Sequence, residues 1–133
     1  MKETTMWIEK EYVDTSQGFK VKLFNVPMEI VRGEPVLAVN RNDYVYSLAR
    51  VLASTDKRWT HDQCRWVRLL MGGNTLLMLL LVPYMSEDDY YLYESGLSSK
   101  HQHLPKQLED ILRAWLKMYG KGIVFEKIEM EIL

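Results

Sequence analysis

The pattern of apolar and polar residues predicts a β-rich first part of the chain. Residues 7–13 and 19–24 flank a polar turn cluster at 14–18, and residues 19–24 alternate apolar and basic side chains as a half-buried strand does. We expect these segments to form a hairpin. Asn25-Val26-Pro27 is expected to end the second strand, with a further strand at 28–31, a turn at 32–35 and a short strand at 36–39.

Helical spacing begins after this β-rich region. Asn42 and Asp43 form an expected N-cap pair, and apolar residues then recur on one helical face as far as residue 53. Residues 54–58 are polar and read as a linker. We therefore divide the chain into a β-rich part with one helix at residues 1–53 and a helical part at residues 54–133.

The helical part contains several segments with their own start and stop signals. Thr60 and Gln63 match a capping box, which predicts a helix from 60 to 71 that ends at Gly72-Gly73. A wholly apolar helix is expected at 75–82, and Ser86 is expected to cap a helix that ends at Gly96. Residues 105–119 show the clearest amphipathic spacing, with Pro105 as the expected first helical residue.

The last residues of the chain alternate in character. Ile128, Met130 and Ile132 are separated by charged residues, which favours an edge strand that pairs with the N-terminal hairpin or with a second copy of the chain. The expected fold class is therefore α+β. A small N-terminal β-hairpin-rich part precedes a helix-turn-helix-like bundle of four to five helices.

Composition narrows the function classes only modestly. The formal net charge of the 133-residue chain is −1, so no global attraction to nucleic acid or to an anionic membrane is expected. Cys64 is the only cysteine, and the first residues do not form a signal peptide. The apolar run at 76–82 is far shorter than the roughly 20 residues of a membrane span. A soluble, cytoplasmic protein without membrane contact is expected.

From Thr60 onward the chain resembles the Cro/Xre-type helix-turn-helix of antitoxins in the YgiT/MqsA group. The residues that carry the resemblance are Thr60, Gln63, Arg65, Trp66, Arg68, Gly72, Ser86, Tyr93, Glu94 and Gly96, followed by Leu112-Arg113-Ala114 in the closing helix. Residues 24–29 and Gly33-Glu34 resemble the β-rich domain that precedes the motif in that family. The family often holds zinc there through two Cys-x-x-Cys pairs, which this chain lacks, so no zinc or other cofactor is carried over.

The resemblance implies a DNA-reading helix at 86–96, but the charge of this segment argues against that role. Between Leu69 and Ser99 there is no Lys or Arg, whereas Glu87, Asp88 and Asp89 would meet a phosphate-lined groove. The helix dipole alone explains carboxylates in a first turn. The candidates for DNA phosphate contacts lie outside this helix; they are Lys57, Arg58, Arg65 and Arg68.

Protein binding is the preferred interpretation of the same segment. An apolar second helix has no solvent face, and tyrosines beside carboxylates are typical of interface anchors, although core packing also explains some of the tyrosines. The predicted partner-binding residues are Leu77, Leu80, Tyr84, Asp88, Asp89, Tyr90 and Tyr91.

No catalytic motif is present, so we expect no enzyme activity. His61, Cys64, His101 and His103 do not have the spacing of a common zinc site, and we expect no metal. The predicted function is a regulatory protein of antitoxin or transcriptional-regulator type with a degenerate helix-turn-helix. It would act through a homodimer or a toxin-like protein partner. The alternative is a sequence-specific DNA-binding repressor.

Overall fold

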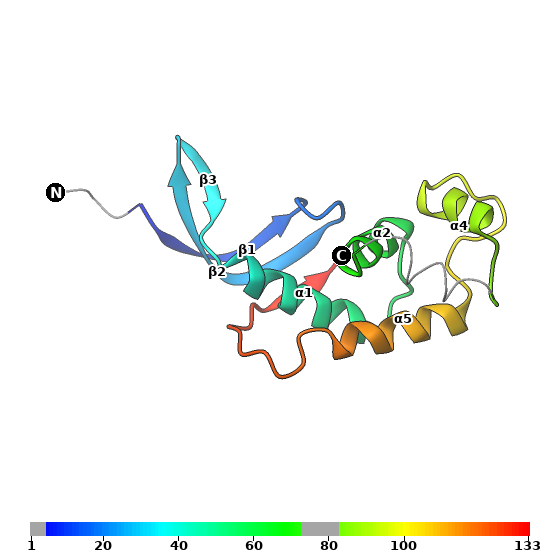
Figure 1. Ribbon diagram of the computed structural model, residues 1–133. Coiled ribbons are helices and arrows are strands. Elements are labelled where there is room, and N and C mark those ends of the chain that lie inside the picture. Colours follow the sequence, from blue (N-terminus) through cyan, green and yellow to red (C-terminus); the bar gives the residue numbers. More distant parts are fainter. Residues whose placement is uncertain (1–4, 73–82) are drawn as a thin grey trace.

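The computed structural model describes residues 5–72 and 83–133 (Figure 1). The elements are β1 (Trp7–Asp14), β2 (Val21–Val31), β3 (Glu34–Leu37), α1 (Arg41–Ser54), α2 (His61–Leu70), α4 (Glu87–Glu94), α5 (Lys106–Met118) and β4 (Met130–Ile132). The strands form one antiparallel sheet beside the helices, which confirms the α+β class. The predicted helix at 75–82, with Leu77 and Leu80, lies outside the described residues.

The sheet is built around β2, which is the longest strand. β1 pairs along one edge of β2, while β3 and β4 share the other edge at opposite ends. Met130 pairs with Leu23 and Ile132 pairs with Val21. The alternating tail is thus confirmed as a strand, although a shorter one than the alternation indicates, and it pairs with the N-terminal hairpin.

The prediction that Asn25-Val26-Pro27 would end the second strand is wrong. Phe24 pairs with Glu11 and Val26 pairs with Glu9, so β2 continues through Asn25 without a change of register. Asn25 itself adopts a left-handed conformation with a φ of 51°. The buried positions of the strand are Val21 and Leu23 before it, and Val26 and Met28 after it. Asn25 therefore switches which alternate residues of β2 face the core.

The turn between β2 and β3 is tighter than the expected four residues. Val31 pairs with Glu34, which leaves only Arg32 and Gly33 in the turn. Both have positive φ angles, of 54° and 80°, as a two-residue hairpin turn of type I′ requires. Glu34 and Pro35 consequently belong to β3, whose end of the sheet points away from the helices (Figure 1).

The helix starts agree with the sequence prediction to within two residues. In α2, the Thr60 side chain caps the helix and Gln63 completes the capping box, as predicted. In α1, the N-cap is Asn40 rather than the pair Asn42-Asp43, because the Asn40 side-chain oxygen accepts hydrogen bonds from the backbone N–H groups of those two residues at 2.9 and 3.2 Å. In α5, Pro105 is the cap and the helix begins one residue later.

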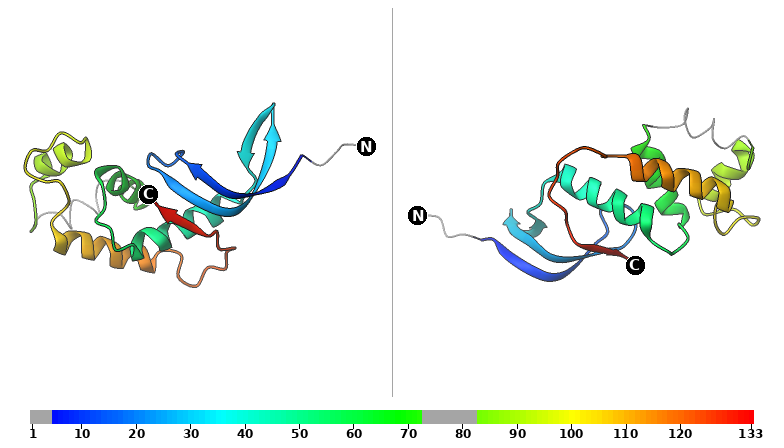
Figure 2. Two further views of the ribbon diagram at one scale, coloured as in Figure 1. Left: turned by 180° about the vertical axis from the view of Figure 1, so that it is seen from behind. Right: turned by 90° about the horizontal axis from the view of Figure 1, so that it is seen from below.

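A single hydrophobic core joins the sheet to the helices. α5 lies along α1, and the end of the chain returns from α5 to the sheet (Figure 2). Leu108, Leu112 and Leu116 of α5 are buried in this core with Leu48 and Leu52 of α1. Among the described residues, none of the helices has the length and apolar character that crossing a membrane requires.

Candidate functional site

The segment that resembles a reading helix forms α4 and has well-defined ends. The Ser86 hydroxyl accepts a hydrogen bond from the Asp89 backbone N–H at 3.1 Å. At the other end, Gly96 has a φ of 78°, and the Leu97 N–H reaches the Leu92 carbonyl oxygen at 2.9 Å. This second bond, with that from the Gly96 N–H to the Tyr93 carbonyl, makes a Schellman motif. The predicted limits at Ser86 and Gly96 are confirmed.

The tyrosines of α4 have different environments. Tyr90 is only 3% exposed and lies in the core with Tyr93, so the structure does not place Tyr90 where a partner could contact it. Tyr91, by contrast, is 75% exposed. Burial raises the pKa of the Tyr90 phenol far above its usual value, so Tyr90 stays neutral. Tyr84, also predicted to bind a partner, is half-buried against the core.

The outward side of α4 combines carboxylates and apolar side chains. Glu87 and Asp88 are exposed, whereas Asp89 is partly covered and lies 3.9 Å from the Lys100 ammonium group. Leu92 and Leu97 are exposed beside Tyr91. The α4 surface, as we define it, consists of Glu87, Asp88, Tyr91, Leu92 and Leu97.

The cations predicted to contact DNA phosphates are engaged within the chain. Arg68 forms a bidentate ion pair with Glu94. Arg68 Nε lies 2.8 Å from Glu94 Oε2, and Arg68 Nη2 lies 2.6 Å from Glu94 Oε1. Arg65 donates to the Glu94 carbonyl oxygen at 3.0 Å. Lys57 donates to the Ile132 carbonyl oxygen at 3.2 Å. These contacts fasten α2 to α4 and the 55–60 connection to β4.

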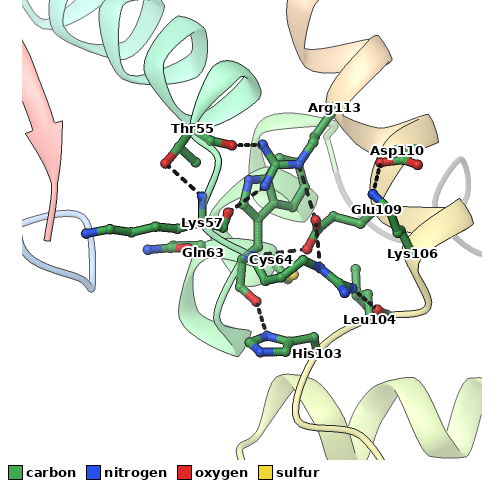
Figure 3. A network of polar contacts seen from close by, with 12 residues as sticks. Thr55, Lys57, Gln63, Cys64, His103, Leu104, Lys106, Glu109, Asp110 and Arg113 are labelled. Atoms are coloured by element: carbon green, nitrogen blue, oxygen red, sulfur yellow. Dashed lines mark hydrogen bonds and ion pairs between the residues drawn. The ribbon is translucent and has the colours of Figure 1, made fainter.

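The fourth candidate, Arg58, bonds to the buried carboxylate of Glu109. Figure 3 shows the polar network around Glu109. The Glu109 carboxylate accepts hydrogen bonds from Arg58 Nε at 3.1 Å, from Arg113 Nε at 3.2 Å and from the Trp59 backbone N–H at 3.0 Å. The Glu109 side chain is only 2% exposed. The sequence prediction did not include Glu109. The signal available was a Glu–Arg pair four residues apart, Glu109 and Arg113, beside the apolar stripe of the helix.

Arg113 also closes the end of α1. Its guanidinium donates to the backbone carbonyl oxygens of Leu52 and Ala53 at 3.4 Å, to that of Thr55, and to that of Lys57 at 2.7 Å. The last carbonyls of a helix lack partners within the helix and carry partial negative charge, so a cation there satisfies them. Arg113 therefore ties α5 to α1 and to the connection that leads into α2.

Trp59 is the meeting point of this network with α4. Its ring is fully buried, lies 5.0 Å from the Arg113 guanidinium, and donates from Nε1 to the Leu52 carbonyl oxygen at 2.9 Å. Its own carbonyl oxygen accepts the Tyr93 hydroxyl at 3.3 Å and lies 3.2 Å from His103 Nδ1. Trp59 thus links α1, α4 and α5.

The histidines and the cysteine of the helical part do not form a common site. His61 and His101 line a shallow hollow of about 290 Å³ together with Gly96. His103 lies against the Trp59 carbonyl, and Cys64 is buried with its sulfur 3.4 Å from the Tyr93 hydroxyl. Within residues 5–72 and 83–133, no three His, Cys, Asp or Glu side chains are grouped to hold a metal ion.

Cys64 is predicted to be unreactive in the folded protein. Burial raises the pKa of its thiol to about 12, so almost no nucleophilic thiolate is present at pH 8. In the folded protein at pH 8, iodoacetamide should label Cys64 no faster than local or global unfolding exposes the thiol. In urea, where the chain is unfolded, labelling should be rapid. Because the folded pKa exceeds the unfolded one, the thiol also makes stability decrease as the pH rises above the unfolded value. Mass spectrometry measures the extent of labelling. Rapid labelling in the absence of urea would contradict the burial of Cys64.

No protein family model matches the chain, and comparisons with curated proteins and with solved structures also return no match.

Proposed function

We propose that this protein is a non-enzymatic regulator with a degenerate helix-turn-helix that acts by binding another protein chain through the α4 surface. The observation that carries the proposal is the character of that surface. The helix in the reading position exposes Glu87, Asp88 and Tyr91 and no basic side chain. A helix of this kind is suited to a partner with basic and apolar groups.

Electrostatics favours a protein partner over DNA. DNA binding depends on cations that neutralise phosphates, and base reading in the major groove depends mainly on Arg, Lys, Asn and Gln. The sequence from Leu69 to Ser99 holds no Lys or Arg. Arg58 is bonded to the buried Glu109, and Arg68 and the more exposed Arg65 are paired with Glu94. A groove-bound α4 would bring the exposed carboxylates of Glu87 and Asp88 toward phosphates, and the helix itself carries no cation.

The apolar members of the α4 surface supply the energy of such a contact. Interfaces characteristically have a desolvated apolar centre and a polar rim, and tyrosine is enriched among the residues that dominate binding. Tyr91 and Leu97 are each about three-quarters exposed and flank the less exposed Leu92. Burying these side chains stabilises a complex, and the carboxylates at the start of α4 select a basic partner.

The first test is substitution of Tyr91 by Ala. If Tyr91 anchors the contact, its loss should weaken association about 30-fold, which corresponds to roughly 2 kcal/mol. Light scattering of the purified chain measures self-association, and co-expression with the products of neighbouring genes measures binding to a second protein. Trp7→Ala is the matched control because Trp7 is a partly exposed aromatic residue in β1, outside the α4 surface.

The same samples test the DNA alternative. Titration with DNA from upstream of the gene, at low and high salt, should show no specific complex. Salt-dependent, sequence-specific binding of this DNA would overturn the proposal, as would protein association that Tyr91→Ala leaves unchanged. Arg68→Ala is a poor probe of DNA binding, because it would also leave Glu94 without its main ion-pair partner.

A further inference from the structure

The C-terminal end of α5 lies away from α4 (Figures 1 and 2). A second group of exposed apolar side chains is found there. The last turn of α5 and the loop that follows it expose Met118, Ile123 and Val124, and Val124 is 99% exposed. Lys117 and Lys121 are exposed beside them. We call these five residues the tip surface.

Aromatic contacts hold the loop of the tip surface in place. Phe125 lies 5.3 Å from the Tyr46 ring of α1 and is covered by the Arg50 guanidinium at 5.6 Å. Tyr46 also lies 5.3 Å from Tyr119, at the end of α5. Phe125 is anchored in this way, and the backbone conformation that places its ring against Tyr46 leaves the neighbouring Val124 side chain in solvent. Exposed apolar side chains that cluster on a fixed loop are a feature of interaction sites.

The tip surface and the α4 surface are opposite in charge. The charged members of the tip surface are Lys117 and Lys121, whereas those of the α4 surface are the carboxylates of Glu87 and Asp88. The other two carboxylates of α4 are paired within the chain, Asp89 with Lys100 and Glu94 with Arg68. In the described part of the chain, neither Lys117 nor Lys121 forms an ion pair. Each surface thus combines exposed apolar side chains with charged ones, and the charges of the two surfaces have opposite signs.

We propose that the tip surface of one copy of this protein docks on the α4 surface of a second copy. This inference rests on the proposed function, because it names the partner of the α4 surface. The two surfaces cannot meet within one chain, since α5, with 13 residues and a length of about 20 Å, separates them. The contact joins two different patches, so the assembly is head-to-tail and grows unless the rotation between copies closes a ring.

Charge reversal provides the decisive experiment. Asp88→Lys disables the α4 surface and leaves the tip surface intact, whereas Lys121→Glu does the reverse. Each variant alone should associate at least about tenfold more weakly than the unmodified chain in sedimentation velocity runs over a range of concentrations. An equimolar mixture should associate again, because the intact tip surface of the first variant fits the intact α4 surface of the second.

Lys10→Glu is the matched control, since Lys10 is an exposed lysine on β1 outside both surfaces, and it should associate as the unmodified chain does. Circular dichroism confirms that each variant is folded. A mixture that stays as dissociated as its components, or an unmodified chain that is monomeric at every concentration, overturns the inference. Suppose that the unmodified chain does not self-associate but binds a different protein, and that Tyr91→Ala abolishes this binding. The proposed function then stands, and only self-association through the tip surface is excluded.

Discussion

Replacing Glu109 by alanine is expected to lower the free energy of unfolding by about 3–5 kcal/mol, because removing one partner of a buried ion pair leaves the other charge without compensation. The carboxylate accepts bonds from two arginines and from the Trp59 backbone N–H. Arg113, whose side chain is 14% exposed, would lose its counter-charge in a largely dry environment. Urea unfolding followed by circular dichroism measures the loss.

The neighbouring carboxylate provides the control for this prediction. Asp110 lies on the same helix and pairs with Lys106 at 3.7 Å, but its side chain is 57% exposed. Asp110→Ala should change stability by less than about 1 kcal/mol, because exposed pairs contribute little. Glu109→Gln keeps the size and some hydrogen bonds, so its loss should be intermediate. Equal stability of the Glu109→Ala and Asp110→Ala proteins would show that the network is not a source of stability.

Replacing Trp59 by alanine is expected to lower the free energy of unfolding by about 3–5 kcal/mol, as truncation of a buried tryptophan does. The ring is fully buried against the Arg113 guanidinium, and its N–H satisfies the Leu52 carbonyl oxygen. Both contacts disappear with the side chain, and a cavity remains. Thermal unfolding monitored by circular dichroism would report the change.

Two other substitutions separate the contributions of Trp59. Trp59→Phe retains an aromatic ring but removes the N–H, so it should lower the free energy of unfolding by roughly 1–3 kcal/mol. The Leu52 carbonyl oxygen would keep only its longer bond from Arg113, and the smaller ring would fill less of the site. Trp7→Ala removes a tryptophan whose N–H bonds only to the exposed Glu9 carboxylate, and it should be nearly neutral. A similar loss for Trp7→Ala and Trp59→Ala would contradict the placement of Trp59 at the centre of the helical part.

Helix starts could be predicted from the sequence where the capping residues themselves determine the start. Thr60 and Gln63 satisfy each other's backbone groups, so the pattern is sufficient to locate the start of α2. At the start of α1, Asn40, Asn42 and Asp43 are all competent caps, and side-chain type alone does not reveal which residue has the extended backbone. Asn40 does, with a ψ of 130°. The ambiguity is therefore resolved by the approach of the preceding chain.

Longer-range structure was predictable only in outline. Asn25 and Pro27 are strand breakers by propensity, yet the pairing of β2 with β1 on both sides of Asn25 overrides them. The alternation at residues 128–132 predicts a strand, but alternation does not identify the strand that pairs with it. Sequence cannot show which edge of a sheet remains open for pairing.

The candidate site shows the same limit. Tyr90 and Tyr91 are adjacent and chemically identical, and the docking of α4 on the core decides that the first is buried and the second exposed. Likewise, Arg58, Arg65 and Arg68 resemble DNA-contacting residues until their carboxylate partners are located. The acidic character of α4, which is a property of composition, was evident without any structure.

The pairing of β4 with β2 has a consequence for the order of folding. Ile132 must reach Val21 across almost the whole described chain, and pairings between residues so distant in sequence form slowly. Until they form, this edge of β2 offers unpaired backbone groups to other molecules, among them the Phe24 N–H and the Lys20 carbonyl oxygen, which bond to Glu129 and Leu133 in the folded chain. Arg113 and Glu109 stabilise the packing of α5 on α1. Once α5 is packed there, β4 is held closer to this edge of β2 and should pair with it faster. Weakening that network should therefore increase aggregation during refolding as well as lower stability at equilibrium.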